Sequence, residues 1–440
     1  MLNDQETYPL HKAAFLNNTQ AIAQMIEAGI DIYEKDLHGN TALHISTILG
    51  HRETTALLLA HNAPVKVKNC DGWNCLQEAI SYGDRQIITS MLRKLKDQSK
   101  EKMSMSKPNL CKVLEELDDF YLEFKWNFNS WIPFVSKVLP SDTCRVFKKG
   151  SYLRLNTTLV DFNDRNWERG DISFIINPNS KKIENEIIIL DNKSKVFQRI
   201  RKIESDAELD EEIDVLMSSD IMSAQASSKP IKFVRATEGW IFKKDKSSII
   251  GEYDVDYYLI EGLSLVSRKR REHLTQEDIK NNKAFFRQLT SGHITSNDDD
   301  FRNLQHRKSL PPPGRTSTTW EEYIGSAAGC PPPLGRPQVF KENTKIVKAS
   351  VGMSETFPID INILIKILEL LSSVKHFDKL RRFIDHRLPP GFPVHIELPL
   401  LPTISANISF KNFQFRNDLI DSMFCIPKNY REDPTRFPDL

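Results

Sequence analysis

A repeat with a period of 33 residues restricts how the first part of this chain can fold. The strings YPLHKA, TALHIS and NCLQEA begin at Tyr8, Thr41 and Asn74, and each places its leucine and its small residue at equivalent positions. Gly50 and Gly83 also occupy equivalent places, where a helix would end. Such a period predicts stacked helical units, because one unit can bury its apolar side only against its neighbours.

The middle copy, residues 36–63, resembles the ankyrin repeat, whose signature is T-P-L-H-x-A. The resemblance implies about three helix pairs over residues 1–100, which bind protein partners and carry no chemistry. His44 falls on the histidine of the signature, so we expect it to bond backbone between adjacent turns and not to act in catalysis. Leucines such as Leu43 and Leu58 are expected in the core of the stack.

The next segment, residues 101–144, is predicted to be a helical cap and connector at the end of the stack. Its apolar residues fall at helical spacing over Leu110, Leu114, Leu117, Tyr121 and Phe124. The string WNFNSWIPF follows, with Trp126, Phe128, Trp131 and Phe134. A tryptophan-rich string can lie at a membrane interface, but we interpret this one as a core segment, since the helix before it needs a partner.

From about Phe147 onward, apolar and polar residues alternate, which is typical of strands. Short polar links join these strands, so residues 145–292 are predicted to form an antiparallel curved sheet or open barrel. Residues 341–440 hold two apolar helices, one over Ile361–Leu371 and one from Phe377 to Leu388, and two alternating strands, and are expected to complete the same domain. The predicted fold is an α + β multidomain protein, with an N-terminal ankyrin-repeat helical stack followed by an antiparallel β-rich α+β domain.

Two polar stretches interrupt this pattern. The stretch Glu204–Asp220 holds eight acidic residues and no basic one, which predicts a solvated loop with a short helix. It does not match a ubiquitin-interacting helix, because Leu216 and Asp220 stand where that motif needs alanine and serine. Residues 293–340 contain SLPPPGR and CPPPLGRP and are interpreted as a linker, with docking of an SH3 or WW domain as the alternative. Ser309 follows basic residues there and is a candidate phosphorylation site.

Four consecutive basic residues, Arg268, Lys269, Arg270 and Arg271, fall between a predicted strand and a predicted helix. The favoured interpretation is a solvated structural face that pairs with acids such as Glu272 or with the acidic stretch. The alternatives are a contact with a membrane or a partner, and a nuclear import signal. A nucleic-acid contact is not expected, because the whole chain carries a net charge of only +1.

The sequence lacks the short motifs that carry common chemistries: no Walker loop, no GxGxxG, no GxSxG, no HExxH and no CxxC pair. It therefore predicts a binding protein that is not an enzyme and uses no cofactor or metal. The N-terminus does not resemble a signal peptide. The most apolar window, Ile359–Leu371, is interrupted by charges and is shorter than the roughly 20 residues of a membrane span. We expect a cytoplasmic protein, soluble or peripheral to a membrane.

Several strings together are similar to the ankyrin repeat domain-containing 13 family, and most to its C-type branch, over about Tyr8 to Leu440: RGDISFI, DVLMSSDI, SRKRREHL, TWEEYI, LPPGFPV and DPTRFPDL. The resemblance implies that the region after the stack is a GPCR-chaperone domain. It further implies a molecular chaperone for newly made G protein-coupled receptors, peripherally associated with the cytosolic face of the endoplasmic reticulum. Its expected partners are those receptors or their cytosolic segments, and the membrane surface.

The sequence departs from the family in two respects. The C-type branch carries a long polar N-terminal extension, whereas this chain begins almost at the first repeat. Other branches end in ubiquitin-interacting motifs and act on endocytosed receptors, but this chain shows none, so ubiquitin binding is not expected. An ankyrin-based trafficking or endocytic adaptor for receptor cargo is the alternative function, and a nuclear scaffold addressed by the basic run is a third.

Overall fold

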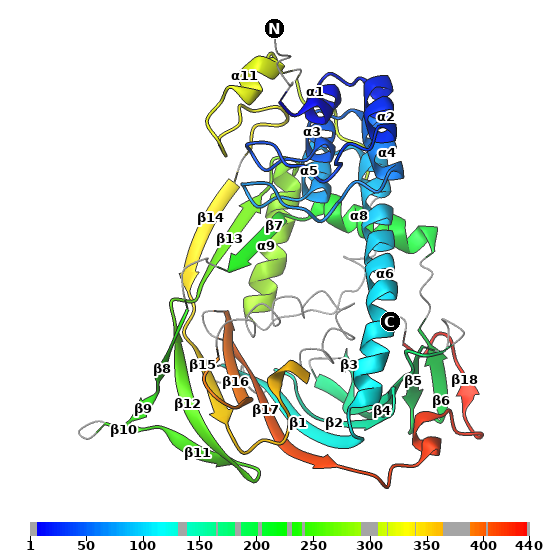
Figure 1. Ribbon diagram of the computed structural model, residues 1–440, viewed down its shortest axis with the longest axis vertical. Coiled ribbons are helices and arrows are strands. Elements are labelled where there is room, and N and C mark those ends of the chain that lie inside the picture. Colours follow the sequence, from blue (N-terminus) through cyan, green and yellow to red (C-terminus); the bar gives the residue numbers. More distant parts are fainter. Residues whose placement is uncertain are drawn as a thin grey trace. The chain divides into compact units, whose positions relative to one another are not determined.

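The computed structural model describes most of the chain, and its contacts divide it into two compact units. The described residues are 7–130, 139–163, 166–180, 186–200, 205–226, 231–239, 243–291, 307–314, 316–338, 340–363, 388–401 and 404–437. The stack unit comprises residues 1–100, 204–226 and 265–345, and the sheet unit comprises residues 101–203, 227–264 and 346–440. Each unit is therefore assembled from three separate stretches of the chain (Figure 1).

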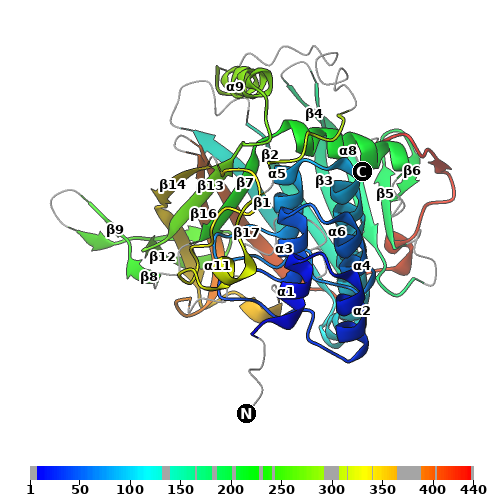
Figure 2. The same ribbon diagram turned by 90° about the horizontal axis from the view of Figure 1, so that it is seen from above.

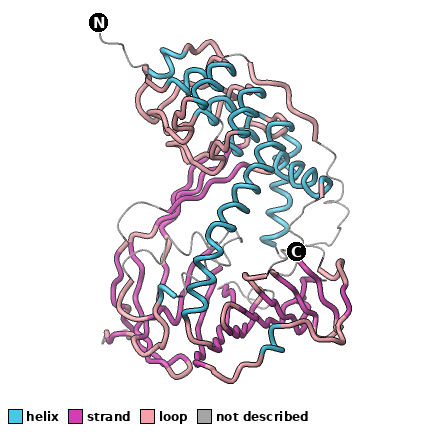
Figure 3. Tube along the Cα trace, turned by 45° about the vertical axis from the view of Figure 1, so that its right-hand side comes forward, coloured by secondary structure: helices cyan, strands magenta, loops and turns pink. Residues whose placement is uncertain are grey.

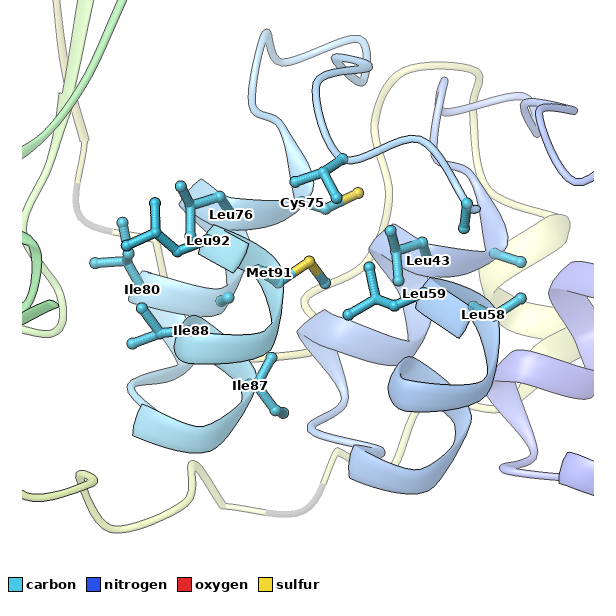
Figure 4. Packing of buried hydrophobic residues seen from close by; sticks show 14 of the residues in the cluster. Leu43, Leu58, Leu59, Cys75, Leu76, Ile80, Ile87, Ile88, Met91 and Leu92 are labelled. Carbon is cyan, nitrogen blue, oxygen red and sulfur yellow. The ribbon is translucent and has the colours of Figure 1, made fainter. Parts of the chain in front are cut away.

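Three helix pairs form the core of the stack unit, one for each copy of the sequence repeat. They are α1 (Pro9–Phe15) with α2 (Thr19–Glu27), α3 (Ala42–Ile48) with α4 (Arg52–Ala60), and α5 (Cys75–Tyr82) with the start of α6 (Arg85–Glu116). Figure 2 shows α1, α3 and α5 in one row and α2, α4 and α6 in a second row beside it. The apolar side chains between the rows are mostly aliphatic, and Leu43 and Leu58 are buried as expected (Figure 4).

Local sequence signals set the helix ends in this unit. Before α5, the Asn74 side chain accepts from the Gln77 backbone N–H at 3.0 Å, and the Gln77 side chain accepts from the Asn74 N–H at 2.9 Å. This reciprocal pair satisfies two donors that the first turn of a helix leaves free. At the other end of α5, Gly83 adopts a φ of +85°, a left-handed conformation that terminates helices and favours glycine.

The acidic stretch forms part of the stack unit, which the sequence did not predict. Its helix α8 (Asp206–Ser218) buries Leu209, Ile213 and Met217 in the same cluster as the stack residues. Arg85 on α6 pairs with Asp210 at 2.9 Å. The acids therefore face basic side chains of α6 while the apolar stripe of α8 enters the core, so this stretch is not merely a solvated loop.

The helical cap expected over residues 101–144 is wrong in its second half. Helix α6 ends at Glu116, and Tyr121 and Phe124 lie in strand β1 (Phe120–Ser130). Phe120 and Leu122 are buried, so the apolar residues here alternate as a strand requires. Trp126 and Phe128 are half-buried in β1 with their rings 5.8 Å apart, and Trp131 and Phe134 lie outside the described residues.

A three-stranded sheet in the order β14-β13-β7 belongs to the stack unit. Its strands are β7 (Ile221–Ala226), β13 (Ser264–Arg270) and β14 (Phe340–Ile346). Figure 3 draws the strands of the protein in magenta and its helices in cyan. Two further helices follow β13 in the sequence, α9 (Gln276–Ser291) and α11 (Trp320–Ile324). Strand β13 is antiparallel to β7, with Arg270 opposite Ile221. The basic run thus begins inside a paired strand.

The sheet unit is built on one large sheet of thirteen strands, which confirms the predicted antiparallel β-rich region. The order is β11-β12-β15-β16-β17-β1-β2-β3-β4-β5-β6-β18, and β8 also pairs with β12. The remaining bounds are β2 (Ser141–Lys149), β3 (Tyr152–Asn163), β4 (Asn166–Ile176), β5 (Ile187–Asp191), β6 (Val196–Arg199), β8 (Lys232–Arg235), β11 (Ser247–Ile250), β12 (Tyr253–Glu261), β15 (Ala349–Ser354), β16 (Phe392–Leu401), β17 (Ile404–Phe415) and β18 (Arg431–Glu432). A short hairpin, β9 (Thr237–Glu238) with β10 (Lys244–Asp245), and the 3-10 helix η2 (Asp421–Phe424) complete the described elements. The pairings are antiparallel, except that β18 is parallel to β6.

Strands from the tail of the sequence complete this sheet, as expected for residues 341–440. Strands β15, β16 and β17 lie between β12 and β1 in the strand order. Aromatic rings dominate the core beneath them: Phe357 stacks on Phe392 at 4.1 Å, and the ring of Phe410 lies 5.2 Å from that of Phe392. Of the two helices predicted in the tail, residues 364–387 lie outside the described residues.

Candidate functional site

The buried histidines of the stack unit hold neighbouring repeats together. Nε2 of His44 lies 3.2 Å from the carbonyl of Trp73 in the next repeat, and Nε2 of His11 lies 3.1 Å from the carbonyl of Asn40. Burial lowers the pKa of His44 to about 4, so its ring is neutral at pH 7. These contacts confirm the structural role expected for His44. Among the described residues, no group of three or more His, Cys, Asp or Glu side chains is arranged to hold a metal ion.

Arg270, in the basic run, is a buried structural residue. Its side chain is 1% exposed and reaches Glu78 of α5 at 2.9 Å and Glu272 at 2.6 Å. Its guanidinium carbon lies 5.0 Å from the centre of the Trp73 ring, a cation–π distance. The hydroxyl of Ser81 accepts from Nη2 at 2.8 Å. The arginine therefore fastens the strand β13 to the last helix pair.

The two sides of this ion pair stabilise each other's charged form. Burial alone would lower the pKa of Arg270, but the carboxylates of Glu78 and Glu272 raise it above its ordinary value. Burial alone would raise the pKa of Glu272, but Arg270 and the hydroxyl of Ser81 hold it below its ordinary value. Both groups thus remain ionised inside the unit, and neither side chain is exposed to another protein.

The other three basic residues are half-buried and also have acidic partners. Arg268 pairs with Glu342 at 2.7 Å and donates to the backbone carbonyl of Asp71. Lys269 pairs with Asp220, and Arg271 lies 3.3 Å from the same carboxylate. The pairing expected from the sequence, with Glu272 and with the acidic stretch, is present, but the expected solvated face is wrong for Arg270, which is buried because it meets Glu78 and Glu272 inside the unit. Only Arg268, Lys269 and Arg271 retain exposed side-chain surface for a membrane or partner, at 30%, 27% and 30%.

Ser309, the candidate phosphorylation site, lies against the start of α6. Its hydroxyl accepts from the backbone N–H of Arg85 at 3.0 Å, and the residue is exposed. The next residue, Leu310, donates its N–H to the carbonyl of Gly83 at 2.8 Å. The hydroxyl therefore satisfies one of the donors at a helix N-terminus. These contacts place Ser309 on the surface of the stack unit; they leave its modification a prediction.

The proline-rich stretch was interpreted as a linker, but its described part packs on the stack. Tyr323 of α11 is fully buried, and its hydroxyl donates to Oδ2 of Asp36 at 2.6 Å and accepts from Asn40 at 2.9 Å. Trp320 packs its ring 5.6 Å from that of Phe15 and belongs to a cluster that includes Ile45. A spacer would leave such side chains in water, so residues 316–337 are a docked segment.

The second half of this segment is fixed by backbone contacts. Nε of Arg336 donates to the carbonyl of Ser81 at 3.0 Å, and Leu334 is buried in the same cluster as Trp320. Gly335 comes so close to α3 that a Cβ there would lie 3.0 Å from the carbonyl oxygen of Ile48. Sequence reasoning missed this docking, although Thr319 and Glu322 form a capping-box pattern that predicts a short helix.

The described helices include none that is both long enough and apolar enough to cross a membrane. The short, apolar window noted in the sequence, Ile359–Leu371, lies mostly outside the described residues.

Comparison with known proteins matches the two parts of the chain to two family models. Residues 3–102 match the family model described as ankyrin repeats in three copies, and residues 154–436 match the model described as ANKRD13 C-terminal. The described stack accordingly has the fold of a protein-interaction module, and no activity is named in either description.

Relatives align with nearly the whole chain. It is 49% identical over 433 residues to "Ankyrin repeat domain-containing protein 13C" of Homo sapiens, an alignment that covers 98% of this chain and 79% of that protein. The protein of the same name in Danio rerio is 48% identical, with 98% and 88% covered. "Ankyrin repeat domain-containing protein 13B" of Homo sapiens is 31% identical, with 97% and 71% covered. This chain belongs to the ankyrin repeat domain-containing protein 13 family, and it resembles the 13C members more than this 13B member.

Proposed function

We propose that this chain is a non-enzymatic chaperone or escort for newly made G protein-coupled receptors at the cytosolic face of the endoplasmic reticulum. The observation that carries the proposal is its similarity to the 13C relatives over 98% of its length. A chaperone of this kind needs surfaces that hold an unfinished client and does not need a nucleotide site, which agrees with the lack of a phosphate-binding loop in the sequence.

One edge of the large sheet supports this proposal. Strands β11 and β8 both pair with β12, and β11 ends the strand order among the described strands. Apolar side chains are exposed there: Ile249 on β11 is 72% exposed, Leu259 on β12 is 47% exposed, and Val234 opposite it is 41% exposed. An edge strand offers unpaired backbone groups to an extended segment of another chain.

A pocket beside this edge adds apolar surface for such a client. It has a volume of about 500 Å³. Its lining comprises residues 231–234, Tyr258 and residues 388–390, which include two prolines. We propose that an extended apolar segment of an immature receptor pairs with this edge and places a side chain in the pocket until it packs within its own fold.

Substitution of the edge tests the proposal. We expect Ile249→Lys together with Leu259→Lys to reduce receptor co-precipitation several-fold, because a charge at a client-facing position opposes apolar contact. The matched control is Met105→Lys, which changes an 81% exposed methionine on α6. The glycoform of the co-precipitated receptor is read at the same time, because a newly made receptor retains endoglycosidase H-sensitive glycans.

Two results would contradict the proposal. Equal co-precipitation by the edge variant and the control variant would exclude this edge as the client surface. Association with only the mature, endoglycosidase H-resistant receptor, or strong retention of the purified chain on immobilised ubiquitin, would favour the alternative of an endocytic adaptor for receptor cargo.

We further propose that any membrane contact made by the basic run comes from Arg268, Lys269 and Arg271, because Arg270 is buried. Each basic residue near an anionic surface contributes about 1 kcal/mol to membrane binding. The triple variant to serine, with Arg270 kept, should therefore float less well with phosphatidylserine vesicles. Unchanged flotation of a folded triple variant would exclude this surface as the attachment site.

A further inference from the structure

The surface of the stack that carries the docked segment 316–337 is built as a binding site in its own right. Oδ1 of Asp36 accepts from the backbone N–H groups of His38 and Asn40, both at 2.9 Å. The side chain of Asn40 is held in turn by the amide of Asn69 at 3.1 Å. These contacts fix Asp36 and Asn40 without any help from the segment, so the acceptor and the donor that meet Tyr323 are preorganised.

The segment, for its part, has the features of a bound peptide. Between residues 316 and 337 only Trp320, Tyr323 and Leu334 are buried, and the residues between them are half-buried or exposed. A few aromatic anchors, surrounded by residues that contribute little to the binding free energy, are typical of a protein–protein interface. There a handful of residues supply most of that free energy. A core segment would instead bury a continuous set of side chains.

We propose that residues 316–337 act as an internal ligand that occupies the partner-binding surface of the ankyrin stack. A partner of matching chemistry presents a tryptophan and a tyrosine one helical turn apart. It binds there only after the internal segment has left. The tyrosine hydroxyl of such a partner enters the site between Asp36 and Asn40, and its tryptophan packs on Phe15 and Ile45. This inference goes beyond the receptor proposal and holds for any partner of the stack.

The covalent link makes the internal ligand an effective competitor. A ligand that belongs to the same chain as its binding site has an effective concentration on the order of millimolar. A free peptide of the same sequence therefore displaces the segment only when its own concentration exceeds this effective concentration. The wild-type chain is therefore closed to partners at micromolar concentration, and weakening the anchors opens it.

A labelled synthetic peptide of residues 314–338 tests this inference by fluorescence anisotropy with the full-length chain. We expect the double variant Trp320→Ala/Tyr323→Ala to bind the peptide at least tenfold more tightly than the wild-type chain does. A control peptide with alanine at both aromatic positions should bind neither protein. The chain variant Tyr323→Phe loses only the hydroxyl contacts with Asp36 and Asn40. It should bind the labelled peptide with an affinity between those of the wild-type chain and the double variant.

A reversible cross-link provides a second measurement, in which the same variant is closed by oxidation and reopened by reduction. A Cβ at Gly329 would lie 3.7 Å from Cβ of Cys70, within the range of about 3.5–4.5 Å for a disulfide. In Gly329→Cys with Cys330→Ser, oxidation should lock the segment on the stack. Peptide binding in the background of Trp320→Ala/Tyr323→Ala should then fall at least tenfold, and dithiothreitol should restore it.

The inference is overturned by either of two results. The first is tight peptide binding by the wild-type chain, within tenfold of the double variant. The second is failure of the double variant to bind the peptide while hydrogen exchange shows α3 and α4 as protected as in the wild-type chain. Neither result bears on the edge of the large sheet, so the receptor proposal stands or falls separately.

Discussion

The stack unit and the sheet unit bury their side chains in different ways. In the stack unit each helix pair contacts mainly the next pair along the sequence, and buried histidines such as His44 bond across one repeat boundary. In the sheet unit the first strand, β1, pairs along its length with the last long strand, β17, and aromatic rings fill the core. Stability among the three helix pairs is therefore a sum of neighbouring interfaces, whereas the sheet depends on joining the two ends of its sequence.

The largest effect is expected in the aromatic core of the sheet unit. Phe357→Ala removes a ring that stacks on Phe392 at 4.1 Å, and should lower the free energy of unfolding of that unit by about 4 kcal/mol. Leu58→Ala is the matched truncation in the stack and should cost about 3 kcal/mol. Hydrogen exchange should show protection lost in the mutated unit first. If either substitution lowered hydrogen-exchange protection equally in both units, the two units would not be separately cooperative.

Removal of Arg270 should be the most damaging change of charge in the stack unit. Arg270→Ala leaves Glu78 and Glu272 buried without their cation and should cost about 3 kcal/mol. Arg268→Ala, at a side chain that is 30% exposed, should change the free energy of unfolding by less than about 0.5 kcal/mol. Urea unfolding with hydrogen exchange on α5 measures both. Similar losses from the two variants would mean that burial of the ion pair is not what distinguishes them.

Acid should weaken the stack unit before the carboxylates are protonated. The pKa of His44 is about 4 in the folded chain against about 6.5 for an exposed histidine, so the unfolded chain takes up the proton first as the pH falls. Stability is fully present above pH 6.5 and declines between pH 6.5 and pH 4, with about 2 kcal/mol lost at pH 5. His44→Gln should flatten this dependence. A stack in the wild-type chain that is as stable at pH 5 as at pH 7 would refute the expectation.

The smallest effect is expected at Ser309, whose hydroxyl caps the start of α6. Ser309→Ala removes the acceptor of the Arg85 N–H and should lower the stability of the stack unit by about 0.5 kcal/mol, because water replaces much of the lost bond. Ser317→Ala, at another exposed serine, is the control. A thermal shift that is equal in the two variants would show that the contact contributes nothing.

Features encoded in neighbouring residues could be predicted from the sequence. The repeat located three helix pairs, the signature assigned His44 a structural role, and alternation indicated an antiparallel sheet. Features that depend on contacts between residues far apart in the sequence could not be predicted. Nothing near Asp210 in the sequence shows that its helix packs on α6, and the prolines beside Tyr323 suggested a linker although the ring is fully buried on the stack.

The sequence by itself determined the repeat architecture and the family, because the period and the short strings occur within continuous stretches of the chain. Only the tertiary structure separated Arg270 from Arg268, two identical side chains in one basic run. Alternation along a strand places both on one face, but only Arg270 meets Glu78 and Trp73 of the last helix pair. The physical reason is that burial of a charge depends on which partners the fold brings to it, and those partners lie almost 200 positions away in the chain.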